Sequence, residues 1–192
     1  MVLPSYYLPP VSWFAALKSG EPIAIEVFEN YQKQGLRNRC YIDSPNGKLA
    51  LSIPIDKSNF SDKGKCLMKD VRLSNQLDWR HQHWFAFETS YFNSPFFEYL
   101  QDDFRPIFDK EWRYLVDLNE TIIEKCLELL ELDVNIQRTE EYKGLSLDEK
   151  TQLINSNNRQ YYQVYQQKHS FLENLSIFDL LMNMGPEASL YL

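Results

Sequence analysis

A short polar segment between two apolar stretches carries the side chains best suited to chemistry. Lys33, Arg37 and Arg39 are cationic, and Asn38 adds an amide. Arginine holds a carboxylate or a phosphate with two parallel hydrogen bonds, and asparagine both donates and accepts, as a sugar hydroxyl requires. If Arg39 points inward from its strand, the segment predicts a binding site for an anion or a sugar.

The same residues also have a structural explanation. Arg39 could pair with Glu26 or Asp43 as a structural tie, while the other cations are merely solvated. Cys40 follows the segment directly, and a nucleophilic thiol there would need a nearby base and a depressed pKa. Cys40 can equally belong to the core, so the segment by itself does not select a reaction.

A second group of polar residues lies toward the C-terminal end. Tyr162 has a flat apolar face with a polar tip, and Gln163 adds an amide, a pairing common in carbohydrate recognition. His169 is the histidine best placed to carry a proton, and its structural alternative is a cap on a backbone carbonyl. Ser176 and Asp179 could complete a triad with His169, but their spacing before an apolar helix favours a capping pair.

Three further polar features predict little chemistry of their own. His81 and His83 fall about 200° apart on a helix and cannot share one metal ion, so no metal site is expected. Asp102 and Asp103 likewise diverge around their helix and are expected to be solvated. Asn119 lies beside an apolar stripe, so its amide needs partners, either backbone groups or a ligand. The motifs leave any cofactor unidentified.

Composition limits the classes to which the chain can belong. The 192 residues are 44% hydrophobic, which suits one domain over residues 1–192. A net charge of −7 argues against a nucleic-acid partner, because phosphate binding needs a basic field. Three cysteines, no secretory signal and no membrane-length apolar run predict a protein of the reducing cytoplasm without a membrane span. The 15% aromatic content permits an oligomer without requiring one.

Hydrophobic periodicity and turn residues predict the elements that position these side chains. Strands are expected at residues 1–3, 22–28, 39–43, 48–55, 68–73 and 136–142. Helices are expected at residues 12–18, after Asp78, from Ser94 until Pro106 ends or kinks the helix, and at 115–129, 146–155 and 176–184. The predicted class is α+β or mixed α/β, with a strand-rich N-terminal part forming one sheet and a helix-rich C-terminal part packed on it.

Three segments, in order and spacing, resemble the WbqC-like family over almost the full length. They are Pro4–Pro9 followed by Trp13 and Phe14, Lys33 with Arg37–Arg39, and Tyr162–Gln163 with Asn174–Leu181 and Gly185–Glu187. The resemblance implies a role in the biosynthesis of O-antigen or another surface polysaccharide. Many members place a His-Gln pair before the opening proline, where this chain has Val2 and Leu3.

The resemblance leads to two functional hypotheses. In the first, the chain is a group-transfer enzyme for a sugar on a nucleotide or lipid phosphate. The opening turn at residues 4–10, the Lys33–Arg39 loop and the Tyr162–His169 stretch would then meet over one cleft, with His169 as the proton carrier. In the second, which the missing His-Gln pair favours, the chain is a non-catalytic module that binds a sugar or a partner enzyme.

Overall fold

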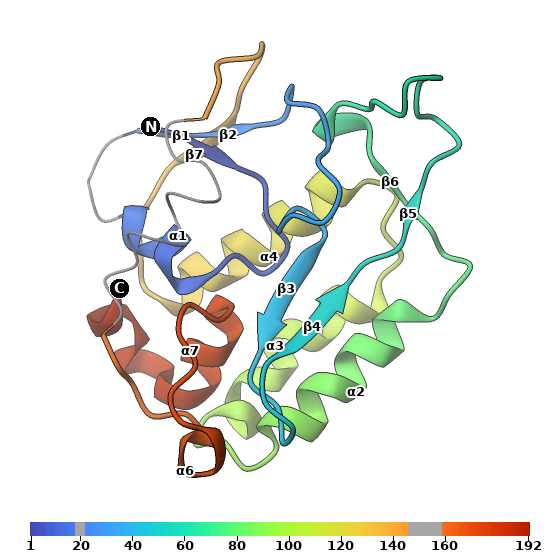
Figure 1. Ribbon diagram of the computed structural model, residues 1–192. Helices are drawn as coiled ribbons and strands as arrows, with labels where there is room; N and C mark the ends of the chain where they lie inside the picture. The colour runs from blue at the N-terminus through green and yellow to red at the C-terminus, as the bar shows by residue number, and fades with distance from the viewer. Residues whose placement is uncertain (18–21, 146–158) are drawn as a thin grey trace.

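A small parallel sheet forms one side of the molecule in this computed structural model (Figure 1). The structure describes residues 1–17, 22–145 and 159–192. The sheet contains β1 (Val2–Pro4), β2 (Ile23–Glu26) and β7 (Ile136–Arg138), with β2 in the middle. Parallel neighbours need long crossovers, and here α1 (Val11–Leu17) follows β1, while the three longest described helices lie between β2 and β7. The predicted mixed α/β class is confirmed.

The remaining described strands form two separate antiparallel pairs instead of extending the parallel sheet. β3 (Arg39–Ile42) pairs with β4 (Leu49–Ser52), and β5 (Ile55–Asp56) pairs with β6 (Arg72–Leu73). The predicted hairpin turn at Ser44–Gly47 is confirmed, since Ser44 Oγ donates to Gly47 O and Gly47 N–H donates back to Ser44 O. The expectation of one sheet was wrong, because Pro54 interrupts the chain after β4 and the next short strand pairs elsewhere.

Four helices carry most of the core. They are α2 (Trp79–Tyr91), α3 (Phe97–Asp109), α4 (Leu115–Leu129) and α7 (Ile177–Met184). The Phe178 ring of α7 lies 4.4 Å from the Phe87 ring of α2 and 5.0 Å from the Phe104 ring of α3, centroid to centroid. Aromatic pairs at such distances add to the free energy of burial, so the C-terminal helix is anchored between helices distant in sequence.

Three local predictions differ from the structure. Residues 68–73 form a 3₁₀ turn, η1 (Met68–Asp70), before β6, because Met68 N–H and Lys69 N–H donate to carbonyls of the segment after β2. Helix α3 begins at Phe97, because the Ser94 hydroxyl donates to Tyr91 O instead of capping a new helix. Pro106 lies inside α3, which continues to Asp109. The predicted helix at 146–155 lies outside the described residues.

Gly185 closes α7, and substituting it is expected to be costly. It has a φ of +51°, and an added Cβ would overlap the Phe96 ring, which is held at the start of α3. We expect Gly185→Ala to lower the free energy of unfolding by about 2–4 kcal/mol, the sum of left-handed backbone strain and overpacking. Urea unfolding measures this loss.

Gly64 is the matched control for that substitution. It has a φ of +70° but no atom within 4 Å of an added Cβ, so Gly64→Ala should cost only the strain of about 1 kcal/mol. Equal losses at the two glycines would show that the contact with Phe96 contributes nothing.

Candidate functional site

The side chains of the cationic segment, residues 33–39, make several different structural contacts. Arg37 is 1% exposed, and its Nε and one terminal nitrogen donate to the two carboxylate oxygens of buried Glu29, at 2.9 and 2.8 Å. Asn119 of α4 donates to Arg37 O at 3.0 Å and to Ser5 Oγ at 3.2 Å. The Arg37 fork therefore ties the loop to Glu29, and the Asn119 amide nitrogen has protein partners, while its Oδ1 is buried without a partner among the described residues.

The other members of the segment lie closer to the surface. Asn38 Nδ2 donates to Ile53 O at 2.7 Å, and its Oδ1 accepts from the Tyr31 hydroxyl at 2.9 Å. Arg39 Nε donates to Ser52 Oγ on the neighbouring strand at 2.8 Å, and Lys33 is exposed. The structural alternative, in which Arg39 pairs with Glu26 or Asp43, is replaced by this hydroxyl contact.

Glu26 is occupied by other groups at the carboxyl end of β2. Its carboxylate accepts hydrogen bonds from Phe28 N–H at 2.8 Å, the Thr139 hydroxyl at 3.0 Å and Lys143 N–H at 2.8 Å. Since Glu26 is 0% exposed, these three donors satisfy a carboxylate that water cannot reach.

His169 and Arg39 lie at opposite ends of β3 and do not form one site. His169 ends α6 (Gln166–His169), and its Nε2 lies 3.1 Å from Ser44 O and 3.3 Å from Asp43 Oδ1. Asp43 follows β3, whereas Arg39 begins it, so their backbones are about 13 Å apart at the usual strand rise. The convergence of Arg39 with His169 was therefore a wrong expectation, and the carbonyl cap is the alternative that the structure displays.

Behind His169 lies a cluster of buried polar side chains, here called the acid cluster: Asp43, Tyr91, Tyr161, Gln163 and Asp179. The carboxylate of Asp179 accepts hydrogen bonds from the hydroxyls of Tyr91 and Tyr161, both at 2.7 Å, and from the amide nitrogen Nε2 of Gln163 at 3.2 Å. Burial raises the pKa of Asp179 to about 6, and nearby Asp43 adds to the rise while these hydrogen bonds oppose it. Burial raises the pKa of Asp43 as well. Two buried carboxyl groups thus share one small region.

The acid cluster also explains why the predicted capping pair does not form. Asp179 is drawn to the two tyrosines, and Ser176 makes no side-chain cap bond at the start of α7. Instead Ser176 N–H donates to Tyr41 O, and Ile177 N–H donates to Pro9 O, each at 2.8 Å. Ser176 Oγ is buried and has no hydrogen-bond partner among the described residues.

Ser176 opens onto a hollow of about 310 Å³, here called the junction pocket. Three parts of the chain line it: the opening turn, the region from the Lys33–Arg39 loop into the β3–β4 hairpin, and the segment before α7. The lining residues are Leu8, Pro10, Leu36, Cys40, Tyr41, Lys48, Asn174 and Ser176. The opening turn contributes Leu8 and Pro10, and the Lys33–Arg39 loop contributes only Leu36, so none of the loop's predicted binding residues is in the lining. The third part of the lining is the Asn174–Ser176 segment and not the Tyr162–His169 stretch.

Backbone strain and charge both occur at this pocket. Leu8 and Asn174 have φ values of 42° and 50°, and left-handed non-glycine residues often cluster at functional sites. Lys48 Nζ lies 4.6 Å from the centroid of the Tyr41 ring at the exposed side of the pocket. Lys48, Tyr41 and Asn174 were not identified from the sequence, where Lys48 reads only as the first residue of a strand.

The remaining candidates have ordinary structural surroundings. Tyr162 is 46% exposed, whereas Gln163 is buried. The Gln163 side-chain amide donates to Leu172 O and accepts from Leu172 N–H. Burial raises the pKa of the Cys40 thiol far above its usual value, so Cys40 stays a neutral lining residue and not a thiolate nucleophile. Asp103 pairs with Lys125 at 3.5 Å.

The two α2 histidines have different environments. His83 Nδ1 lies 2.8 Å from the Tyr7 hydroxyl, and burial lowers the pKa of His83 to about 4. His81 is exposed on the other side of the helix. Among residues 1–17, 22–145 and 159–192 no group of three His, Cys, Asp or Glu side chains is placed to hold a metal ion.

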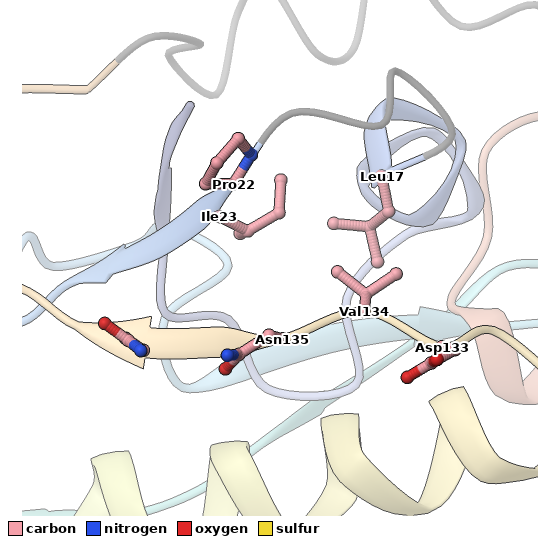
Figure 2. A pocket seen from close by; sticks show the side chains of 7 residues that line it. Leu17, Pro22, Ile23, Asp133, Val134 and Asn135 are labelled. Carbon is pink, nitrogen blue, oxygen red and sulfur yellow. The ribbon is translucent and has the colours of Figure 1, made fainter.

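A second hollow, of about 360 Å³, lies at the amino ends of β2 and β7 (Figure 2). Figure 2 shows Leu17, Ile23 and Val134 pointing toward one another, while the Asp133 carboxylate points away from them. Ligands of open α/β sheets bind beyond the carboxyl ends of the strands, which is the opposite end. We therefore take the junction pocket as the candidate functional site.

The fold and the junction pocket define a mixed α/β protein whose opening turn, cationic loop and C-terminal helix start surround one sugar-sized hollow. The chain belongs to the WbqC-like protein family, which matches residues 4–164. Comparison with curated proteins and with solved structures finds no match. No helix in the described part of the chain is long and apolar enough to cross a membrane.

Proposed function

We propose that this protein is a cytoplasmic enzyme of surface-polysaccharide (O-antigen) biosynthesis that transfers a group on a phosphate-linked amino sugar. The single observation that carries the proposal is the junction pocket. The opening turn and the Lys33–Arg39 loop, which both lie in the part that matches the WbqC-like family, contribute to its lining or flank it, and the Asn174–Ser176 segment beyond that match completes it. A concave hollow lined by apolar residues with a few polar groups is the usual form of a small-molecule site.

The chemistry of the lining supports a sugar with an anionic substituent. Leu8, Pro10 and Leu36 form an apolar wall on which the C–H face of a sugar ring can pack. Lys48 supplies the cation for a phosphate, and Arg39 lies on the same face of the hairpin as Tyr41, two residues along β3. Lys33 and Arg39 remain predicted outer contacts for a substrate that extends beyond the pocket.

His169 remains the predicted proton carrier in this proposal, although it is not among the residues that line the junction pocket. Its Nε2 faces two acceptors, Ser44 O and Asp43 Oδ1, so Nε2 carries a hydrogen, and Nδ1 is buried without a hydrogen-bond partner among the described residues. Once a transfer assay is available, we expect His169→Ala to lower kcat by about 100-fold or more. Unchanged turnover in that variant would remove His169 as the acid or base.

Ligand stabilisation tests the proposal most directly. Nucleotide-sugars and sugar phosphates are expected to raise the melting temperature of the wild-type chain by mass action. Lys48→Ala should lose most of that shift, because it removes the cation at the pocket. Lys63→Ala, which changes an exposed lysine remote from the pocket lining, is the matched control and should retain the shift. A shift equally large in both variants would contradict a role for the pocket.

The second candidate function is a non-catalytic binding module for glycan-pathway enzymes. It is favoured by Val2 and Leu3, which occupy β1 where many family members carry a His-Gln pair. It is also favoured by the contacts of His169, which hold α6 on the hairpin turn together with Lys168, whose Nζ donates to Pro45 O. Ligand binding without turnover on any tested sugar phosphate would select this function.

A further inference from the structure

Ser176, the residue before α7, lines the junction pocket and has a hydroxyl that no described group engages. Ser176 is 2% exposed, and its Oγ has no hydrogen-bond partner among the described residues. The main-chain N–H groups of Ser176 and Ile177 already donate to Tyr41 O and Pro9 O. A helix-capping serine would use its oxygen locally, so the free Oγ of a buried, pocket-lining serine indicates an external partner.

The Asn174 side chain adds a hydrogen-bond donor, its amide nitrogen Nδ2, which is identified because the amide oxygen is already bonded. Its Oδ1 accepts the Ser12 N–H at 3.1 Å, and this bond distinguishes the oxygen from the nitrogen of the amide. Nδ2 is therefore the remaining atom, and it too is buried without a partner in the described part of the chain. An amide nitrogen only donates, so the missing partner is an acceptor oxygen.

Lys48 supplies charge at the same pocket. Its ammonium group lies over the Tyr41 ring, and the described lining includes no acidic residue that would neutralise it. Three donors around one hollow, one of them cationic, are complementary to a group with several oxygens and a negative charge. Phosphate esters and carboxylates share that chemistry.

The size of the pocket limits what accompanies the anion. A volume of about 310 Å³ lies at the lower end of the range for small-molecule sites. One sugar ring with its anionic substituent fits that range, whereas the nucleoside of a nucleotide-sugar would lie outside, beyond the exposed Lys48. The apolar residues Leu8, Pro10 and Leu36 would face the ring.

From these observations we infer that the junction pocket binds an anionic monosaccharide unit through Ser176 Oγ, Asn174 Nδ2 and Lys48 Nζ. The anionic oxygens accept from these three donors, and the ring packs against the apolar wall. This inference rests on the proposed function for the sugar ring, but the anion site follows from the donors alone. The ligand class is a sugar phosphate or a sugar carboxylate, and the probes below separate the two.

Titration of the isotope-labelled full chain by NMR tests the inference. The probes are N-acetylglucosamine phosphate, glucuronic acid, neutral N-acetylglucosamine and inorganic phosphate. At least one anionic sugar is expected to shift the Asn174 side-chain amide and the Ser176 backbone signals, and to bind about tenfold or more tightly than the neutral sugar. The stronger of the two anionic sugars identifies the anion that the site takes.

Two variants sharpen the result. Ser176→Ala should weaken binding of the anionic sugar by about tenfold. The melting temperature should stay unchanged, because Ser176 makes no cap bond that could be lost. Loss of a real cap would lower the melting temperature by about 2–4 °C. Lys48→Ala should reduce the affinity for the anionic sugar to the affinity measured for the neutral sugar. If Ser176 acted only as a helix cap, Ser176→Ala would lower the melting temperature and leave the affinity for the anionic sugar unchanged. That result would overturn the inference.

The outcome is distinguishable from failure of the proposed function. Anionic sugars that bind at Ser176 and Asn174 without any glycan-transfer activity leave this inference standing and end the enzymatic proposal. Transfer activity that Ser176→Ala and Lys48→Ala both leave unchanged overturns the inference alone. Absence of any shift at Asn174 with all four probes overturns it as well.

Discussion

Replacing Arg37 by Met is expected to lower the free energy of unfolding by about 3–5 kcal/mol, the largest single effect predicted for this chain. The guanidinium and the Glu29 carboxylate are both buried and joined by two hydrogen bonds. Removing Arg37 leaves the Glu29 carboxylate without that partner in a region that water cannot reach. Urea unfolding at neutral pH, with the midpoint and slope compared between variants, measures the loss.

A double variant and a surface control show whether the buried pair is the cause. Arg37→Met combined with Glu29→Met should recover most of the lost stability, because two apolar side chains carry no unpaired charge. Arg105→Met removes an exposed pair with Asp109 and should stay within about 1 kcal/mol of wild type. A double variant as unstable as the single one would mean that shape, and not the orphaned charge, determines the cost.

Raising the pH from about 4 to about 6 is expected to remove about 3 kcal/mol of stability that protonated Asp179 contributes. Burial raises the pKa of Asp179 from its ordinary 3.8 to about 6 in the folded chain. A raised pKa means that the folded state retains a proton which the unfolded state has released. The contribution is therefore complete below pH 3.8 and is lost as the pH rises through about 6.

The measurement compares unfolding free energies of wild type and Asp179→Asn across that pH window. Asparagine is neutral at every pH, so the stability of wild type relative to the variant should fall by about 1.4 kcal/mol per pH unit and then level off. Asp102→Asn, which changes an exposed carboxylate on α3, should show no such slope. A flat difference at Asp179 would show that the hydrogen bonds from Tyr91 and Tyr161 outweigh burial.

Elements determined by local rules were predictable from the sequence. The turn at Ser44–Gly47 forms because proline, asparagine and glycine suit a tight reversal, and α4 forms where an apolar stripe repeats with helical spacing. Asn119 was recognised as an amide in need of partners because it lies beside that stripe. Its partners, Ser5 and the carbonyl of Arg37, are distant in sequence and emerged only when the chain folded.

Predictions failed where a distant group competed with a local one. Ser176 and Asp179 have the spacing of a capping pair, but two tyrosine hydroxyls hold the Asp179 carboxylate inside the core. For Arg39 the structural alternative was an ion pair with Glu26 or Asp43, but its Nε donates to a serine across the hairpin. A local rule cannot anticipate such competition, because the strength of a buried hydrogen bond depends on what surrounds it.

The sequence by itself determined the family and the mixed α/β class, because periodicity, turn residues and segment order are properties of the chain. Only the tertiary structure decided which side chains line the junction pocket. In a strand the side chains alternate, and which residues are covered depends on what packs against each face. For that reason the lining of the junction pocket includes Lys48, Asn174 and Ser176, whereas Arg37 is a buried tie to Glu29.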